Sequence, residues 1–156
     1  MRETVNQAFS LEVPEGFRSM SQEELKRLYQ NENPNRWGIW DEERHVSIVV
    51  LWKQFPALVC WLADMKTMAQ RNQQLTEKGY AANKYLFQGY LSVKTDGATL
   101  EGYRFCFRVG DVAQAAETVL LKHKKTVYSL SCVGRKENSA ADQETFHRVL
   151  NDLKIL

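Results

Sequence analysis

The sequence lacks every motif that would mark a catalytic or cofactor site. It contains no G-x-S-x-G elbow, no P-loop, no G-x-G-x-x-G and no H-E-x-x-H. Its eight glycines are dispersed, so no glycine-rich loop is available to bind phosphate groups. The three histidines, His45, His123 and His147, are too far apart in sequence to form a local pair of metal ligands. We therefore expect no cofactor and no metal, and we predict that the chain is not an enzyme.

Cysteine is scarce as well. Cys60, Cys106 and Cys132 form no C-x-x-C pair, and their odd number argues against a disulfide framework. A free cysteine packs like a small apolar residue, so we expect three buried, reduced thiols. The first nine residues include Arg2 and Glu3 and have no apolar core, so we expect no signal peptide there. Together these features predict a cytoplasmic protein.

Long apolar runs and a strong charge bias are also absent. The most apolar run, residues 46–52, is interrupted by Ser47, whereas a membrane-spanning helix needs about 20 apolar residues. We therefore expect no membrane association. The 21 basic residues are nearly balanced by 19 acidic ones, giving a net charge of +2, which argues against a nucleic-acid partner. The basic stretch 122–125 is interpreted as a charged turn that protects the sheet edge.

The remaining features describe one ordinary domain. A chain of 156 residues that is 44% hydrophobic and 26% charged can bury a single core, so we assign residues 1–156 to one domain. The apolar pattern predicts strands at 7–13, 36–40, 45–53, 85–93, 100–109, 115–123 and 126–133. It predicts helices from a capping box at Ser21 to about Tyr29, over 57–78, and from Ser139 to the end of the chain.

Several local signals support these elements. Ser21 and Glu24 have the spacing of a capping box, and Asp96-Gly97 is a strong hairpin turn. Asp142, three residues after Ser139, indicates a second capped helix. The 57–78 helix has an apolar stripe, predicted to be buried, made of Leu58, Trp61, Leu62, Met65, Met68, Ala69 and Leu75. Because helices and strands do not alternate regularly, the order predicts an α+β fold: an antiparallel sheet sandwiched between helices.

The opening segment F-x-L-x-V-P-x-G-F, from Phe9 to Phe17, resembles the start of the PsbP-like fold group. That group includes PsbP, the Mog-type Ran-binding factors and many bacterial proteins. The stretch 125–130 and the last amphipathic helix are similar too, so the resemblance covers nearly the whole chain. The resemblance implies a sheet between helices and a protein that binds other macromolecules rather than performing catalysis. It transfers no functional residue to this chain.

Two tryptophans lead to a candidate surface for a protein partner. Trp37 and Trp40 lie beside the charged turn 41–44, and on one strand they point to opposite faces. An exposed tryptophan beside charges is typical of an interface anchor, although both rings could instead cap the core. The candidate surface consists of Arg36, Trp37, Trp40, Glu42, Glu43 and Arg44. Trp52 and Trp61 are assigned to the core.

A second hypothesis places a pocket between the sheet and the long helix. Arg104, Cys106 and Arg108 share one face of a strand, where cations could lower the thiol pKa and activate Cys106. The chain would then be a cysteine-dependent enzyme or a small-ligand carrier. The two arginines are about 13 Å apart along the strand, too far to bind one anion together. An open sheet also leaves edge strands through which a homodimer could form.

Overall fold

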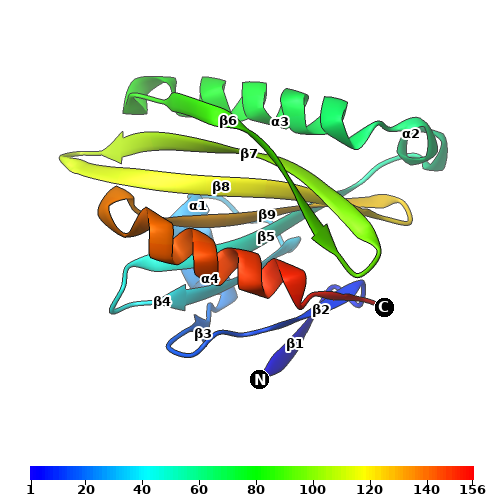
Figure 1. Cartoon of the computed structure of the whole chain (residues 1–156), viewed down its shortest axis with the longest axis horizontal. Helices are drawn as coiled ribbons and strands as arrows, with labels where there is room; N and C mark the ends of the chain where they lie inside the picture. The colour runs from blue at the N-terminus through cyan, green and yellow to red at the C-terminus, as the bar shows by residue number, and fades with distance from the viewer.

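The computed structural model describes residues 1–156, and its centre is a seven-stranded antiparallel sheet (Figure 1). The spatial order of its strands is β3-β4-β5-β9-β8-β7-β6, and every neighbouring pair is antiparallel. The strands are β3 (Arg18–Ser19), β4 (Arg36–Asp41), β5 (Val46–Gln54), β6 (Leu86–Thr95), β7 (Ala98–Val109), β8 (Val112–His123) and β9 (Thr126–Arg135). This confirms the predicted α+β class with a central antiparallel sheet.

A second, smaller sheet joins the two ends of the chain. It consists of β1 (Arg2–Val5), β2 (Phe9–Glu12) and β10 (Lys154–Ile155) in the order β1-β2-β10. The sequence pattern predicted only the middle strand. Of the two outer strands, β1 pairs with β2 across the short turn 6–8, whereas β10 pairs with a segment distant in sequence: Ile155 lies opposite Phe9. The long-range pairing of β10 leaves no local signature.

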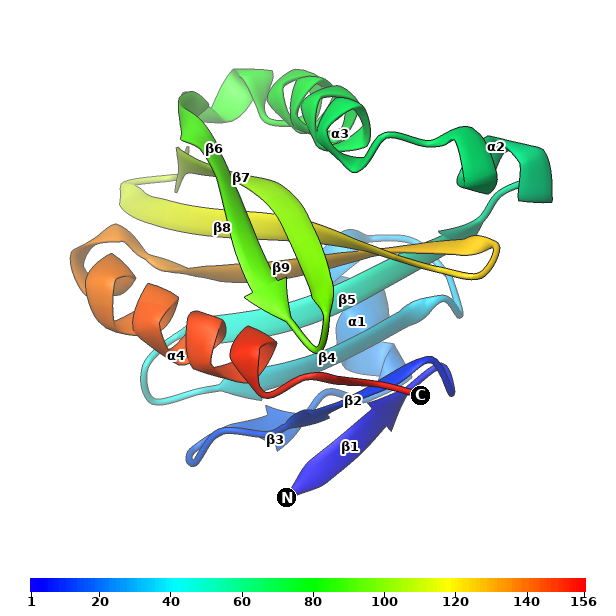
Figure 2. The same ribbon diagram turned by 45° about the vertical axis from the view of Figure 1, so that its right-hand side comes forward.

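Helices cover both faces of the large sheet (Figures 1 and 2). Two points of attachment prove that α3 (Met65–Gly79) and α4 (Ser139–Asn151) lie on opposite faces. Thr76 of α3 hydrogen-bonds Tyr103, which lies opposite Thr118 of β8, whereas His147 of α4 bonds the preceding residue, Glu117. The other helices are α1 (Gln22–Tyr29), the short α2 (Ala57–Leu62) and the 3-10 turns η1 (Ala81–Asn83) and η2 (Lys136–Asn138). None of these helices has the length and apolar character that crossing a membrane requires.

The core has two unequal parts. The larger part lies between α4, the small sheet and the central strands, and its helical side consists of Phe146, Val149 and Leu150 of α4, with Leu153 just after the helix. The smaller part lies beneath α3 and consists of Tyr103, Phe105, Phe107 and Ala116, with Tyr80 and Tyr85 packed against it. The sheet therefore separates two apolar layers, one on each of its faces.

The predicted 57–78 helix is broken, and its stripe is largely exposed. Ala63 is extended, with ψ of 123°, and Asp64 begins α3 by accepting hydrogen bonds from the Lys66 N–H and the Thr67 hydroxyl. Trp61 is 78% exposed, so its assignment to the core is wrong. Its neighbours Leu58 and Leu62 are exposed as well, because α2 extends past the sheet.

Two other local predictions are confirmed. In the capping box, the Glu24 N–H donates to Ser21 Oγ and the Ser21 N–H donates to Glu24 Oε1, each at 3.1 Å. The Asp96-Gly97 turn joins β6 to β7 with φ of +39° and +77°, positive at both central positions as a type I′ turn requires. The second capping signal is wrong: Asn138 is the N-cap, and Asp142 is buried instead.

We predict that Gly102→Ala destabilises the fold by about 2–3 kcal/mol. A Cβ on Gly102 would overlap the Thr118 carbonyl oxygen and approach Val119 Cα to 2.8 Å, so the β7–β8 pair would have to separate. Urea unfolding measures the change. Gly79→Ala is the matched control, because nothing lies within 4 Å of its Cβ position, and its unfolding midpoint should not fall. Equal midpoints for Gly102→Ala and the unmodified chain would contradict the prediction.

Candidate binding site

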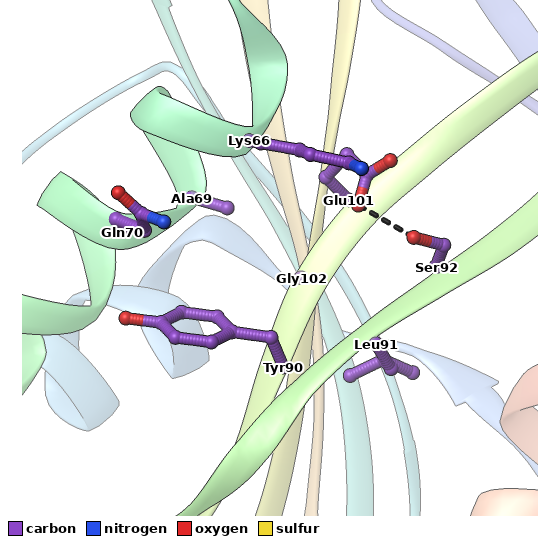
Figure 3. Close-up of a pocket in the computed structure, with 8 residues that line it drawn as sticks. All are labelled: Lys66, Ala69, Gln70, Tyr90, Leu91, Ser92, Glu101 and Gly102. Carbon is purple, nitrogen blue, oxygen red and sulfur yellow. Dashed lines mark hydrogen bonds between the residues drawn. The ribbon is translucent and has the colours of Figure 1, made fainter.

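An open groove of about 400 Å³ lies between α3 and the β6–β7 hairpin (Figure 3). One wall comes from the first half of α3, and the other comes from the edge strand β6. The floor is formed by β7 at Glu101 and Gly102. The lining residues are Lys66, Ala69, Gln70, Tyr90, Leu91, Ser92, Glu101 and Gly102.

A β-bulge shapes the outer wall of the groove. The β6–β7 register shifts between Phe87 and Tyr90, and Gly89 has φ of +108°, a conformation that favours glycine. The rings of Phe87 and Tyr90 lie 4.8 Å apart between centroids, and both side chains are exposed. The bulge therefore presents an aromatic pair at the rim of the groove.

The groove contains one charge of each sign. Ser92 donates a hydrogen bond of 2.5 Å to Glu101 Oε2, and Figure 3 shows the Lys66 side chain extending toward the same carboxylate. The Tyr90 ring extends toward α3 on the other side of the opening. The set of hydroxyl, amide, amine and carboxylate groups can donate to and accept from a peptide backbone. No group of His, Cys, Asp and Glu in the chain is arranged to hold a metal ion.

Aromatic residues beneath α3 hold that wall in place. The Tyr103 hydroxyl donates to Asn72 Oδ1 at 2.5 Å and lies 2.8 Å from Thr76 Oγ1. Gln73 Nε2 donates to the Tyr85 hydroxyl at 2.9 Å. Burial raises the pKa of Tyr103 to about 12, although the hydrogen bond from Thr76 opposes the shift. These bonds attach α3 to the sheet, so this wall of the groove is held in place by the fold.

Arg36 lies inside the protein, so its predicted place on an exposed partner surface is wrong. Its side chain points toward α1 and is only 4% exposed. The guanidinium lies over the Tyr29 ring, 4.7 Å from the centroid, and donates to the Asn31 carbonyl oxygen at 3.1 Å. The ring and the carbonyl oxygen satisfy the buried cation, which the strand pattern alone did not indicate.

The two tryptophans of the predicted surface point to opposite faces of β4, as expected. Trp37 is half-buried against the larger core, and its Nε1–H donates to Glu3 Oε2 at 3.0 Å. Trp40 is half-buried on the other face and makes an edge-to-face contact with His45, with ring centroids 6.3 Å apart. The two rings therefore do not belong to one continuous patch.

The charged turn between β4 and β5 is tied to α4. Glu42 and Glu43 are exposed, and Arg44 donates to Asp142 Oδ1 at 3.0 Å. Burial raises the pKa of Asp142, and the nearby Arg44 guanidinium opposes that shift. Trp40, Glu42, Glu43 and Arg44 stay a predicted contact surface, distinct from the groove.

Arg104, Cys106 and Arg108 do not line the groove. They alternate with Tyr103, Phe105 and Phe107 and so face the opposite side of the sheet. Arg104 Nε donates to Glu117 Oε2 at 3.3 Å, and Arg108 Nη2 donates to the Asp111 carbonyl oxygen at 2.8 Å. Cys106 is only 7% exposed. The carrier hypothesis expected a pocket between the sheet and the long helix. The groove beside α3 is such an opening, but other residues line it.

The other two thiols are buried as well. Cys60 and Cys132 are 4% and 5% exposed, and all three cysteines are free. Burial raises the pKa of Cys132, and the negative charges of Asp142 and Glu117 raise it further. Such an environment disfavours the thiolate, which is the nucleophilic form.

The residues of the groove were missed because they resemble an ordinary strand. One signal was present: residues 85–93 carry no charge and contain Gly89 within a strand pattern. A glycine in that position indicates a bulge or a close approach of another backbone. The edge position of β6 depends on the strand order of the whole sheet, which local sequence does not reveal.

No protein-family model and no curated protein sequence matches this chain. The fold is similar to that of solved structures. Cyanobacterial PsbP from Synechocystis sp. PCC 6803 superposes with a TM-score of 0.70 at 11% identity, covering 100% of this chain and 92% of that one. LpqN of Mycobacterium tuberculosis, involved in cell envelope biogenesis, gives 0.62 at 12% identity, covering 94% and 82%.

The Ran-binding protein Mog1p of Saccharomyces cerevisiae gives a TM-score of 0.53 at 15% identity, covering 90% of this chain and 78% of that one. The chain therefore has the PsbP- and Mog-like fold, as the sequence resemblance implied. At these identities the likeness extends to the fold and to no individual residue.

We predict that the native protein reacts sluggishly with a thiol reagent such as 5,5′-dithiobis(2-nitrobenzoate) at neutral pH. All three thiols are buried, and the pKa of Cys132 is raised, so little thiolate is accessible. Absorbance should report rapid labelling of all three only after urea unfolding. Rapid labelling of one thiol in the folded protein, lost in Cys106→Ser, would contradict the prediction and restore the cysteine hypothesis.

We also predict that stability falls as the pH rises from 10 toward 12. Burial raises the pKa of Tyr103 to about 12 in the folded state, whereas the unfolded phenol titrates near 10. In this window the unfolded chain has lost a proton that the folded chain retains, so alkali favours unfolding. Urea midpoints across the window measure the slope, and Tyr103→Phe should make it less steep, the remainder coming from Tyr29, whose pKa burial also raises to about 12. A slope unchanged by Tyr103→Phe would contradict the assignment.

Proposed function

We propose that this chain is a non-catalytic binding module that recognises an extended segment of a protein partner. The partner segment would pair with the free edge of β6 and place side chains in the groove beside α3. The single observation that carries the proposal is the composition of this edge. Residues 85–93 include no charge, and Leu86, Phe87 and Tyr90 are exposed there.

A long uncharged edge is unusual because free edges promote pairing with other chains. Natural sheets protect their edges with short strands, charged side chains or bulges. The opposite edge of this sheet follows that rule: β3 has two residues, one of which is Arg18. Along the first half of β6 the bulge is the one feature that protects the edge, and the aromatic rings beside it are exposed. The second half is covered, since Thr95 Oγ1 donates to the Leu153 carbonyl oxygen beside α4.

The groove gives this edge a means of selecting its partner. In strand addition, backbone pairing supplies affinity while pockets for alternate side chains supply specificity. The groove adjoins β6 directly, and its rim has the exposed Phe87–Tyr90 pair. Aromatic side chains are enriched among the residues that dominate binding energy.

The fold is compatible with such a role. Mog1p, which shares it, is a Ran-binding protein, so the fold supports protein recognition in at least one other chain. We do not assign Ran or any related protein as the partner here. The intracellular location expected from the sequence belongs to the same proposal.

We predict that a photo-crosslinking phenylalanine analogue at Phe87 forms an adduct with a protein partner in a lysate of the native host. Leu86→Lys together with Tyr90→Lys should reduce that adduct at least tenfold, because the added charges block pairing at the edge. Both side chains are exposed, so the variant should unfold at an unchanged urea concentration. Leu75→Lys is the matched control, since Leu75 is 66% exposed on α3 and should leave the adduct intact.

Two other outcomes would overturn the β6 assignment. Loss of the captured partner in Trp40→Ala with Arg44→Ala, but not in the β6 variant, would place recognition at the β4–β5 turn. An adduct with a second copy of this chain, together with a dimer in size-exclusion chromatography, would make β6 a homodimer edge instead.

A further inference from the structure

We infer that α2 and the β8–β9 turn together form a docking surface for the face of an anionic lipid bilayer. The surface combines four exposed apolar side chains on α2 with lysines of β5 and of the β8–β9 hairpin at the same end of the molecule. It lies at one end of the molecule, away from the Phe87–Tyr90 rim, and is independent of the proposed protein-binding function. We call it the lipid-facing end.

The apolar side chains share one side of α2. Leu58, Val59, Trp61 and Leu62 are 65%, 48%, 78% and 65% exposed. At 100° per residue these four positions span about 160° of the helix circumference. Cys60 points the opposite way and is 4% exposed, so the helix directs one small residue inward and its large apolar residues outward.

The helix is held firmly enough to present this side. Lys122 Nζ donates to the Cys60 carbonyl oxygen at 2.7 Å, and the Phe55 N–H donates to the Lys125 carbonyl oxygen at 2.8 Å. These bonds connect α2 to β8, and the segment just before α2 to the β8–β9 turn. Figures 1 and 2 agree that α2 and this turn lie at the same end of the molecule, with α2 projecting beyond the sheet.

The charge of this end is complementary to an anionic bilayer. Lys53 of β5, shortly before α2, and Lys124 and Lys125 of the β8–β9 turn are exposed, and Lys122 Nζ contacts α2. One acidic residue, Asp64, follows α2 closely in the sequence. Its carboxylate caps α3. Lysines beside a partly inserted apolar helix bind anionic headgroups, and tryptophan prefers the depth where headgroups meet acyl chains.

The shape of this end favours a bilayer over a protein. The apolar side chains project outward from a short helix, and the groove described above lies elsewhere, between α3 and β6. A protruding apolar surface inserts into a lipid interface without needing a complementary cavity. The sequence analysis expected no membrane because no segment is long enough to cross one. A helix that lies on the surface does not have to cross it.

Co-sedimentation with vesicles tests this inference. We expect the protein to bind phosphatidylcholine vesicles containing about 30% phosphatidylserine, to ignore pure phosphatidylcholine vesicles, and to be released by about 0.5 M salt. Trp61→Ala with Leu62→Ala should weaken binding at least tenfold. Lys124→Ala with Lys125→Ala should weaken it about 25-fold, at about fivefold for each lysine near the surface.

Matched controls distinguish vesicle binding through the lipid-facing end from nonspecific adsorption. Leu75→Ala removes an equally exposed apolar side chain from α3, and Lys136→Ala with Lys154→Ala removes two exposed lysines elsewhere. Both variants should bind vesicles like the unmodified protein. The tryptophan emission should shift to shorter wavelength on vesicle binding. Trp61→Phe should abolish the shift while retaining most of the binding, because phenylalanine keeps the apolar contact.

Three results would overturn the inference. They are an absence of binding to the anionic vesicles, equal binding by the α2 variant and the unmodified protein, and a dimer in size-exclusion chromatography that Trp61→Ala dissociates. The α2 substitutions should leave the crosslink from position 87 unchanged. Failure of the vesicle experiment and failure of the crosslinking experiment are therefore distinguishable.

Discussion

The strict alternation of side chains along the antiparallel strands is the constraint on which the rest of this molecule depends. On β8, Glu117 reaches His147 of α4, while the next residue, Thr118, faces the layer beneath α3. Each face of the sheet therefore needs its own cover. The α4 helix and the small sheet cover one face with the larger core, and α3 covers part of the other over an aromatic cluster.

The helices do not cover the whole sheet. Both proposed surfaces, the first half of β6 and α2, lie where that covering ends. The α4 helix reaches the second half of β6, which leaves the first half as a free edge. At the other end, α2 extends past the strands, so Cys60 packs inward while Leu58, Trp61 and Leu62 stay exposed. Scattered exposed apolar residues are ordinary on a protein surface. Here they are contiguous at the two places where cover is missing, which is the arrangement expected of interaction sites.

Local chemistry explains which features the sequence predicted. The capping box at Ser21 and the turn at Asp96 are complete within four residues, and the fold class follows from the order of patterned segments. The errors arise where a distant segment decides the outcome. Arg36 is buried because α1 provides the Tyr29 ring above it, and Trp61 is exposed because α2 projects past the sheet. Helical periodicity identifies an apolar face but not whether anything covers it. The groove was missed for the same reason, since the edge position of β6 is a property of the whole sheet.

The break at Ala63 connects the fold to the lipid-facing end. In an unbroken helix, Trp61 and Leu62 would share a stripe with Met65 and Ala69, and Ala69 is buried against the sheet. The extended Ala63 and the new cap at Asp64 separate the two helices, so α2 can adopt its own orientation. Only Cys60 then faces inward. One apolar stripe is divided into a half that stabilises the fold and a half that remains available for a partner. The residues that interrupt the helix are thus as important to the exposed surface as the apolar residues that form it.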